Sequence, residues 1–227
     1  MGAFWNTGEM ALDGVAAVES GELKVIRFVV GPLTTNCYAV VSEGRALVVD
    51  PGAEGARVAA ALDVPVELVV ATHGHADHVG GVLALVKATG AKFAIAKADA
   101  ELASRAKRDR ALGLYYDDDA PAPDVTLEPG EVVGVGAASF RVLPAPGHTP
   151  GGVLLVGEGA AEGICFTGDT IFSGSVGRTD LAGGDRAVMT ESLHHAAGEL
   201  APATHLLPGH GDDTTMSWEL RCNPYLR

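Results

Sequence analysis

Three histidines and one aspartate crowd into six consecutive positions of this 227-residue chain. They lie in the stretch Thr72-His73-Gly74-His75-Ala76-Asp77-His78-Val79-Gly80-Gly81, directly behind the apolar residues 68–71. The chain has only eight histidines, so composition does not account for this concentration. Because the backbone can turn sharply where a strand ends and aim alternate side chains at one point, we interpret the stretch as a source of ligands for two metal ions.

Three further residues of ligand type also lie directly after strand-like segments, each beside glycine. They are His148 in Pro146-Gly147-His148-Thr149-Pro150, Asp169 in Thr167-Gly168-Asp169-Thr170, and His210 in Leu207-Pro208-Gly209-His210-Gly211. A sheet holds such residues firmly, and histidine and aspartate are ligands that zinc accepts. The dense cluster and the three separate residues together favour one shared metal site. Asp50, in the turn Asp50-Pro51-Gly52, is expected to support it.

Short apolar runs predict the elements that must position these groups. Strands are expected at 23–30, 36–42, 45–49, 66–71, 92–96, 132–135, 139–144, 152–156, 163–167 and 204–207. Helices are expected at 54–62, 79–89, 99–112 and 186–200. Two halves that each mix short strands with helices predict an α/β fold of two sheets packed face to face, with helices on the outer faces.

Two segments fall outside this pattern. Residues 1–22 show no strong periodicity and are interpreted as an N-terminal leader to a single domain over 23–227. The acidic, proline-broken segment 115–124 is expected to be an exposed loop, and its use as a lid over the site stays an open alternative.

The overall charge excludes some classes of partner. The formal net charge is -13, which argues against nucleic acid, because binding to a phosphate backbone depends on lysine and arginine. The apolar runs are all shorter than the ~18–20 residues that span a bilayer, so no membrane segment is expected. The first twenty residues are acidic and lack the features of a signal peptide. We expect a cytoplasmic protein that acts on a small molecule.

The ligand motifs resemble, in the same order, those of the metallo-β-lactamase superfamily, whose signature is His-x-His-x-Asp-His followed by separate His, Asp and His ligands. The resemblance covers nearly the whole chain from Leu23 onward and implies the αββα sandwich of two mixed sheets. It also implies a division of ligands. One metal ion would be held by His73, His75 and His148, the second by Asp77, His78 and His210, and Asp169 would bridge both.

Within that superfamily the details look like the glyoxalase II-like hydrolases. Asp169 stands where common β-lactamases carry a cysteine, and His75 stands where flavodiiron-type proteins carry glutamate. The runs 174–180 and 223–226 also resemble the small glyoxalase II-like group. Full-length glyoxalase II enzymes append a helical region that helps to hold glutathione, whereas seventeen residues follow His210 here. The identity of the thiol carrier is therefore left open.

This resemblance implies a metal-dependent hydrolase that cleaves a hydroxyacyl thioester. Two divalent ions, zinc or alternatively iron, would share a water and lower its pKa toward ~7, so that hydroxide attacks the carbonyl. Asp77 would be the catalytic residue that orients this nucleophile. Asp50 and Thr72 would fix the imidazoles by hydrogen bonds, and Arg178 would contact an anionic substrate or form an internal salt bridge.

Other functions are compatible with the same ligand residues. Some relatives in the superfamily are mononuclear iron persulfide dioxygenases that keep the whole motif. Hydrolysis of a lactone or another ester is a further alternative, and a non-catalytic metal-binding or partner-binding domain is a third. The acyl group and the oligomeric state are not indicated by the sequence.

Overall fold

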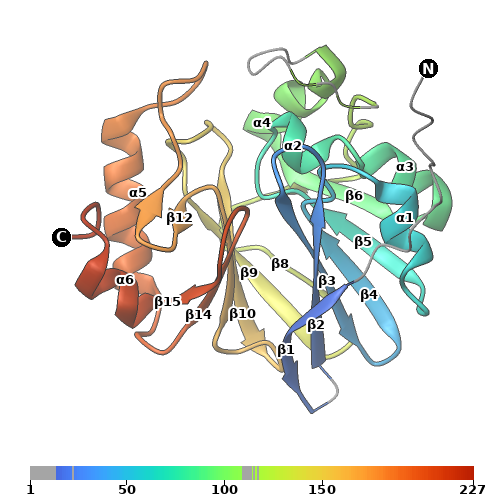
Figure 1. Cartoon of the computed structure of the whole chain (residues 1–227), viewed down its shortest axis with the longest axis horizontal. Coiled ribbons are helices and arrows are strands. Elements are labelled where there is room, and N and C mark those ends of the chain that lie inside the picture. Colours follow the sequence, from blue (N-terminus) through green and yellow to red (C-terminus); the bar gives the residue numbers. More distant parts are fainter. Residues whose placement is uncertain (1–13, 22, 109–113, 115, 117) are drawn as a thin grey trace, which may run out of the picture.

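Two β-sheets pack face to face in the computed structural model of this chain, and helices cover their outer faces (Figure 1). The structure describes residues 14–21, 23–108, 114, 116 and 118–227. Within these residues the first sheet has seven strands in the order β1-β2-β3-β4-β5-β6-β7, and the second has six in the order β15-β14-β11-β10-β9-β8. The αββα sandwich that the sequence predicted is confirmed.

Both sheets are mixed. In the first sheet, β1 (Val15–Ser20), β2 (Leu23–Val30), β3 (Thr35–Ser42) and β4 (Arg45–Val49) are antiparallel neighbours, and β5 (Val66–Val70), β6 (Lys92–Ala96) and β7 (Val125–Leu127) continue parallel to β4. The second contains β8 (Val132–Val135), β9 (Ala138–Pro144), β10 (Val153–Gly159), β11 (Ile164–Gly168), β14 (His205–Pro208) and β15 (Thr214–Thr215). Here β11 and β14 are the parallel pair. A hairpin of β12 (Ile171–Phe172) and β13 (Ser175–Val176) stands apart from both sheets.

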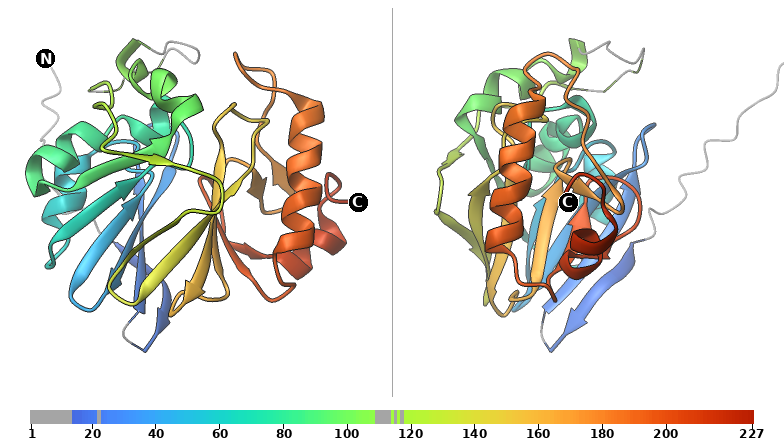
Figure 2. Two further views of the ribbon diagram at one scale, coloured as in Figure 1. Left: turned by 180° about the vertical axis from the view of Figure 1, so that it is seen from behind. Right: turned by 90° about the vertical axis from the view of Figure 1, so that its left-hand side faces the viewer.

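Helices lie on the two outer faces. The first sheet carries α1 (Gly55–Ala60), α2 (Ala76–Val79), α3 (Val82–Thr89), α4 (Lys97–Ala103) and the 3-10 turn Ala106–Arg108. The second carries α5 (Arg186–Glu199) and α6 (Met216–Cys222), and Figure 2 shows α5 running along the side of that sheet that faces away from the first. Among the described helices, none is long and apolar enough to cross a membrane.

Successive side chains of β3 point to opposite faces of the first sheet, so this one strand contributes to two apolar layers. Tyr38 and Val40 face the second sheet, and Tyr38 packs against Phe166 with ring centroids 5.2 Å apart. Cys37 and Ala39 point to the opposite face and join the apolar layer beneath α1 and α3. The strand is therefore buried along nearly its whole length, as expected for a strand covered on both faces.

Some predicted boundaries differ from the structure. Residues 15–20, placed by the sequence in a leader, form the edge strand β1 paired with β2, and Val15 stays 61% exposed. Residues 1–13 lie outside the described residues. The helix expected at 79–89 begins three residues later, as α3 at Val82, and the short helix α2 within the ligand stretch was not predicted. The helix expected at 99–112 ends as α4 at Ala103, and 109–112 lie outside the described residues. Strand β7 and helix α6 were not predicted.

The turn after β4 packs directly against the histidine stretch. Gly81 N donates to Pro51 O at 2.8 Å, and a Cβ at Gly52 would lie 1.4 Å from the carbonyl oxygen of Asp77. Only a residue without a side chain allows this approach of two backbones.

We expect Gly52→Ala to lower the free energy of unfolding by about 1–3 kcal/mol, because the new methyl must push α2 away from the turn. Gly198→Ala is the control. Gly198 lies in α5 with open space around its Cβ position, so alanine there adds roughly 0.5–1 kcal/mol. Urea unfolding measures both, and equal stabilities of the two variants would contradict the close packing at Gly52.

Candidate metal centre

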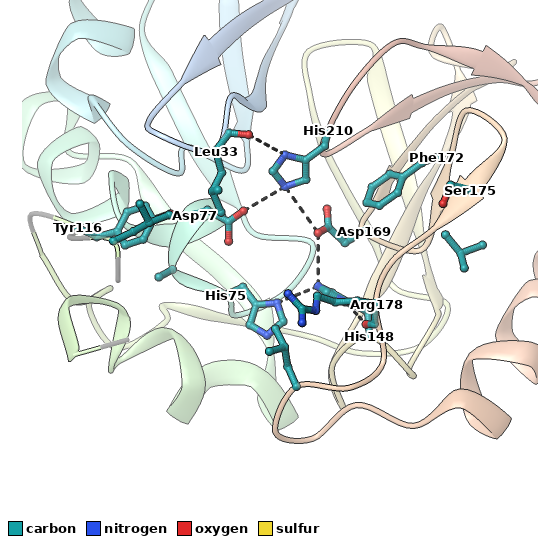
Figure 3. A pocket seen from close by; sticks show the side chains of 14 residues that line it. Leu33, His75, Asp77, Tyr116, His148, Asp169, Phe172, Ser175, Arg178 and His210 are labelled. Carbon is teal, nitrogen blue, oxygen red and sulfur yellow. Dashed lines mark hydrogen bonds and ion pairs between the residues drawn. The ribbon is translucent and has the colours of Figure 1, made fainter. Parts of the chain in front are cut away.

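All seven predicted ligand residues meet between the two sheets, where loops from both converge. Figure 3 shows those that line the cavity: His75, Asp77, His148, Asp169 and His210. The first sheet contributes four of them, from the loop after β5 and from α2: His73, His75, Asp77 and His78. The second sheet contributes three, from the β9–β10 connection and from the ends of β11 and β14: His148, Asp169 and His210. The centre therefore depends on how the sheets are placed against each other.

The ligand atoms form three overlapping groups, each with all its atoms within 4.8 Å of one another. The groups are His73, His75 and His148; Asp77, His78 and His210; and His73, His78 and Asp169. The Asp169 carboxylate lies between the first two, with one oxygen 3.2 Å from His78 Nε2 and the other 3.4 Å from His148 Nε2 and 3.6 Å from His210 Nε2. One carboxylate thus contacts both groups.

Four of the imidazoles have their Nδ1 atom turned to an oxygen outside the cluster. The pairs are His148 with Arg178 O (2.6 Å), His210 with Leu33 O (3.2 Å), His78 with Asp50 Oδ2 (3.0 Å) and His73 with Thr72 Oγ1 (3.1 Å). Carbonyl and carboxylate oxygens only accept, and the Thr72 hydroxyl donates its one proton to Asp50 Oδ2. In each pair Nδ1 is therefore the donor, and Nε2 faces the centre.

The donor set fits metal ions. His73 Nε2 is buried and has no hydrogen-bond partner in the described part of the chain, and His75 Nδ1 lies 2.8 Å from His148 Nε2. A buried lone pair without a donor, such as that of His73 Nε2, is costly unless a cation satisfies it. Imidazole nitrogens with carboxylate oxygens suit a borderline divalent ion such as zinc or iron.

Burial and charge set the protonation of these groups. Burial lowers the pKa of His73 well below its usual value and that of His75 to about 4, and neighbouring imidazoles act in the same direction. Burial also acts to lower the pKa of His78, but the Asp169 and Asp77 carboxylates outweigh it and raise that pKa. Burial acts to raise the pKa of both carboxyls, but the attraction of His78, His210 and a further imidazole together outweighs it and lowers both pKa values. His73 and His75 are therefore neutral at pH 7, the form that binds metal.

Asp50 lies beneath the centre, where the sequence placed a supporting turn. Its Oδ1 accepts from Thr72 N at 2.7 Å, and its Oδ2 accepts from Thr72 Oγ1 at 2.7 Å and from His78 Nδ1 at 3.0 Å. The residue is 2% exposed and has a φ of 51°, a left-handed conformation that is uncommon outside glycine. Thr72 Oγ1 is also hydrogen-bonded to His73 Nδ1. Asp50 therefore orients His78 directly and His73 through Thr72.

Asp99 is a supporting residue that the sequence did not reveal. Its carboxylate is fully buried and accepts from Gly74 N at 2.8 Å and from Gly151 N at 2.7 Å. One side chain of α4 thereby joins the loop of His73 and His75 to the loop of His148. In the sequence it reads as an ordinary acidic residue in the first turn of a helix, and no local signal marks its partners.

Two residues of β3, also unforeseen, hold the loop of His210. Asn36 Nδ2 donates to Pro208 O and Gly211 O, both at 2.9 Å, and Tyr38 Oη donates to Pro208 O at 2.8 Å. The second sheet is thus hydrogen-bonded to the first on both sides of the centre.

A cavity of about 350 Å³ opens above the ligand residues. Arg178 lines it, and its guanidinium makes two 2.7 Å hydrogen bonds to the carboxylate of Asp180, so the salt bridge considered from the sequence is present. Tyr116, from the predicted loop, and Leu114, directly before that loop, also line the cavity. Residues 115 and 117 of that loop lie outside the described residues.

We expect Asp50→Ala to weaken metal binding by roughly 10–100-fold, because Thr72 and His78 lose their shared acceptor and the imidazoles lose their orientation. Competition with a chromogenic chelator measures the affinity. Asp63→Ala removes an exposed carboxylate and serves as the control. An Asp50→Ala protein that binds metal as tightly as this control would refute the supporting role.

Asp99→Asn should lower the free energy of unfolding by about 1–3 kcal/mol, because an amide NH₂ would face a buried backbone N–H. Asp185→Asn is the matched control. Asp185 caps α5 through Oδ1 alone, which accepts from both Ala187 N and Val188 N, so asparagine can keep both bonds. Chemical unfolding of the two variants tests the difference, and a similar loss in both would count against the two-oxygen role of Asp99.

Comparisons with known proteins identify the family of this chain. A family model of the metallo-β-lactamase superfamily matches residues 30–219. The chain is 32% identical over 198 residues to hydroxyacylglutathione hydrolase GloC of Haemophilus influenzae, covering 84% of this chain and 92% of that protein.

Two solved structures are similar along nearly their whole length. A di-iron-bound form of TTHA1623 has a TM-score of 0.78 at 36% identity, and the match covers 87% of this chain and 98% of the TTHA1623 chain. The B3 metallo-β-lactamase BLEG-1 has a TM-score of 0.80 at 28% identity and covers 89% of this chain and 99% of its own. With the ligand residues gathered in one centre, the chain belongs to the metallo-β-lactamase superfamily.

Proposed function

We propose that this chain is a binuclear metallohydrolase that cleaves a small-molecule thioester. The observation that carries the binuclear part is the position of Asp169, whose carboxylate contacts His78, His148 and His210. The similarity to GloC, named a hydroxyacylglutathione hydrolase, supports the thioester part.

The proposed ligands follow the groups in the structure. His73, His75 and His148 would hold one ion, Asp77, His78 and His210 the other, and Asp169 both. Zinc is proposed as the metal, and the di-iron form of TTHA1623 makes iron the alternative. When bound, two divalent ions polarise a carbonyl oxygen and lower the pKa of water toward ~7.

Asp77 is proposed to orient the attacking water. Its Oδ2 lies 3.1 Å from His210 Nε2 and 3.5 Å from Thr35 Oγ1, which fixes the carboxylate at the floor of the cavity. The low pKa of this carboxyl keeps it ionised at neutral pH, since His78 opposes the effect of burial. It can therefore accept a hydrogen bond from the water and hold it toward the carbonyl carbon.

The cavity favours a leaving group that needs no proton donor. Once the ligand residues are set aside, its described lining contains no further carboxyl group and no further imidazole. A thiol has a pKa near ~8.5, so a thiolate departs without general acid help, whereas an amine does not. This chemistry favours a thioester over an amide.

Metal analysis combined with two assays tests the proposal. Near two zinc ions per chain with cleavage of S-lactoylglutathione or a simpler thioester is the expected result. One iron per chain with oxygen uptake on glutathione persulfide would instead identify a persulfide dioxygenase. Two metals per chain with cleavage of lactones or oxygen esters alone would retain the metal site and reject the thioester.

Asp77→Asn should lower kcat by roughly 10²–10⁴-fold, because the water loses the group that orients it, while the ion at His73, His75 and His148 stays bound. Steady-state rates and metal content measured on the same sample test this, with Asp63→Asn as the exposed control. Loss of both ions in equal measure would contradict the division of ligands.

A further inference from the structure

Hydrocarbon forms most of the cavity wall above the ligand residues. Six half-buried side chains from separate parts of the chain face it: Leu33, Leu114, Tyr116, Phe172, Val176 and Leu181. Leu33 precedes β3, and the hairpin β12–β13 supplies Phe172 and Val176. Figure 3 shows Phe172 across the site from Leu33. Apolar surface brought to one cavity from several segments is typical of a site whose ligand is itself largely apolar.

The charges at the cavity point the same way. Arg178 is the one lysine or arginine among the described residues of the wall, and its Nε and Nη2 donate to the two carboxylate oxygens of Asp180. That pairing also lowers the pKa of Asp180 to about 2, so the pair stays ionised and its net charge is zero. Glutathione carries two carboxylates, and this wall offers them no unpaired cation among the described residues.

We propose that the acyl group of the substrate is an uncharged aliphatic chain that lies against Leu33, Phe172 and Val176. The inference rests on the proposed thioester hydrolysis and specifies its substrate. The carbonyl would lie at the floor beside Asp77, and the chain would extend along the apolar wall. Phe172 borders both regions, since its ring packs edge-on against His210 with centroids 6.0 Å apart.

The physical consequence is a dependence on chain length. Each methylene removed from water into the wall should raise kcat/KM about fourfold until the cavity is filled. A hydroxyl on the acyl chain should lower it, because the group loses its bonds to water on entering an apolar wall.

A series of thioesters of one neutral thiol, N-acetylcysteamine, tests the inference with the metal-loaded full chain. The acyl groups are acetyl, butanoyl and hexanoyl, and S-lactoylglutathione is the polar comparison. We expect kcat/KM to rise along the series and to exceed that for S-lactoylglutathione. A flat or falling series, or fastest cleavage of S-lactoylglutathione, would overturn the apolar acyl site and leave thioester hydrolysis standing.

Near-isosteric variants connect the effect to the wall. Val176→Thr and Leu33→Asn should reduce the gain per methylene to about twofold or less, because they replace hydrocarbon by polar groups of similar size. Val132→Thr is the matched control, on β8 and 50% exposed, and should keep the full gain. An unchanged gain in both wall variants, with unfolding midpoints near that of the parent chain, would contradict the inference.

Binding without turnover separates this inference from the proposed function. Butanamide and hexanamide share the carbonyl and the aliphatic chain and are titrated into the protein by NMR. Tighter binding of hexanamide supports the apolar site even where no thioester is cleaved, an outcome that would reject only the hydrolase proposal. Equal binding of the two amides would reject the apolar site.

Discussion

The relative position of the two sheets is the constraint on which the rest of this structure depends. Four ligand residues belong to the first sheet and three to the second, so a small slide between the layers would separate the groups that must share an ion. The apolar layer between the sheets supplies most of the adhesion, but hydrophobic contact is non-directional and sets no register. Directional bonds are needed for that.

Those bonds come from a few buried polar side chains placed around the centre. Asp99 joins loops of both sheets on the side of His148, and Asn36 and Tyr38 do so on the side of His210. Each satisfies backbone groups that would otherwise be buried without partners. Glycine at the contact points lets the chains approach, as at Gly209, where a Cβ would lie 2.5 Å from both Asp169 Oδ1 and His78 Cε1. Polar bonds and small residues together give the ligands the fixed placement that catalysis needs.

The sequence predicted the parts of this arrangement that are local in the chain. The ligand residues could be predicted from their density and from their position after apolar runs. Asp50 could be predicted because it begins a turn of the type Asp-Pro-Gly. The roles of Asp99 and Asn36 were not predicted because their hydrogen-bond partners are far away in the sequence. Asp99 binds Gly151, 52 residues away, and Asn36 binds Pro208, 172 residues away. Strand β1 was not predicted because it lies at the edge of the sheet. Its exposed Val15 weakens the alternation of apolar and polar residues by which strands are recognised.

Position 50 must satisfy two independent structural requirements, and together they limit which residue types can occupy it. The backbone requires a residue that tolerates a left-handed conformation, which favours glycine, asparagine and aspartate. The three donors around the side chain require an acceptor at both of its tips. Glycine meets the first demand without the second, asparagine turns an NH₂ group toward a donor, and glutamate is one carbon too long and does not favour the backbone. Aspartate alone among the twenty residues satisfies both requirements. In a site of this geometry, no substitution at this position would therefore be neutral.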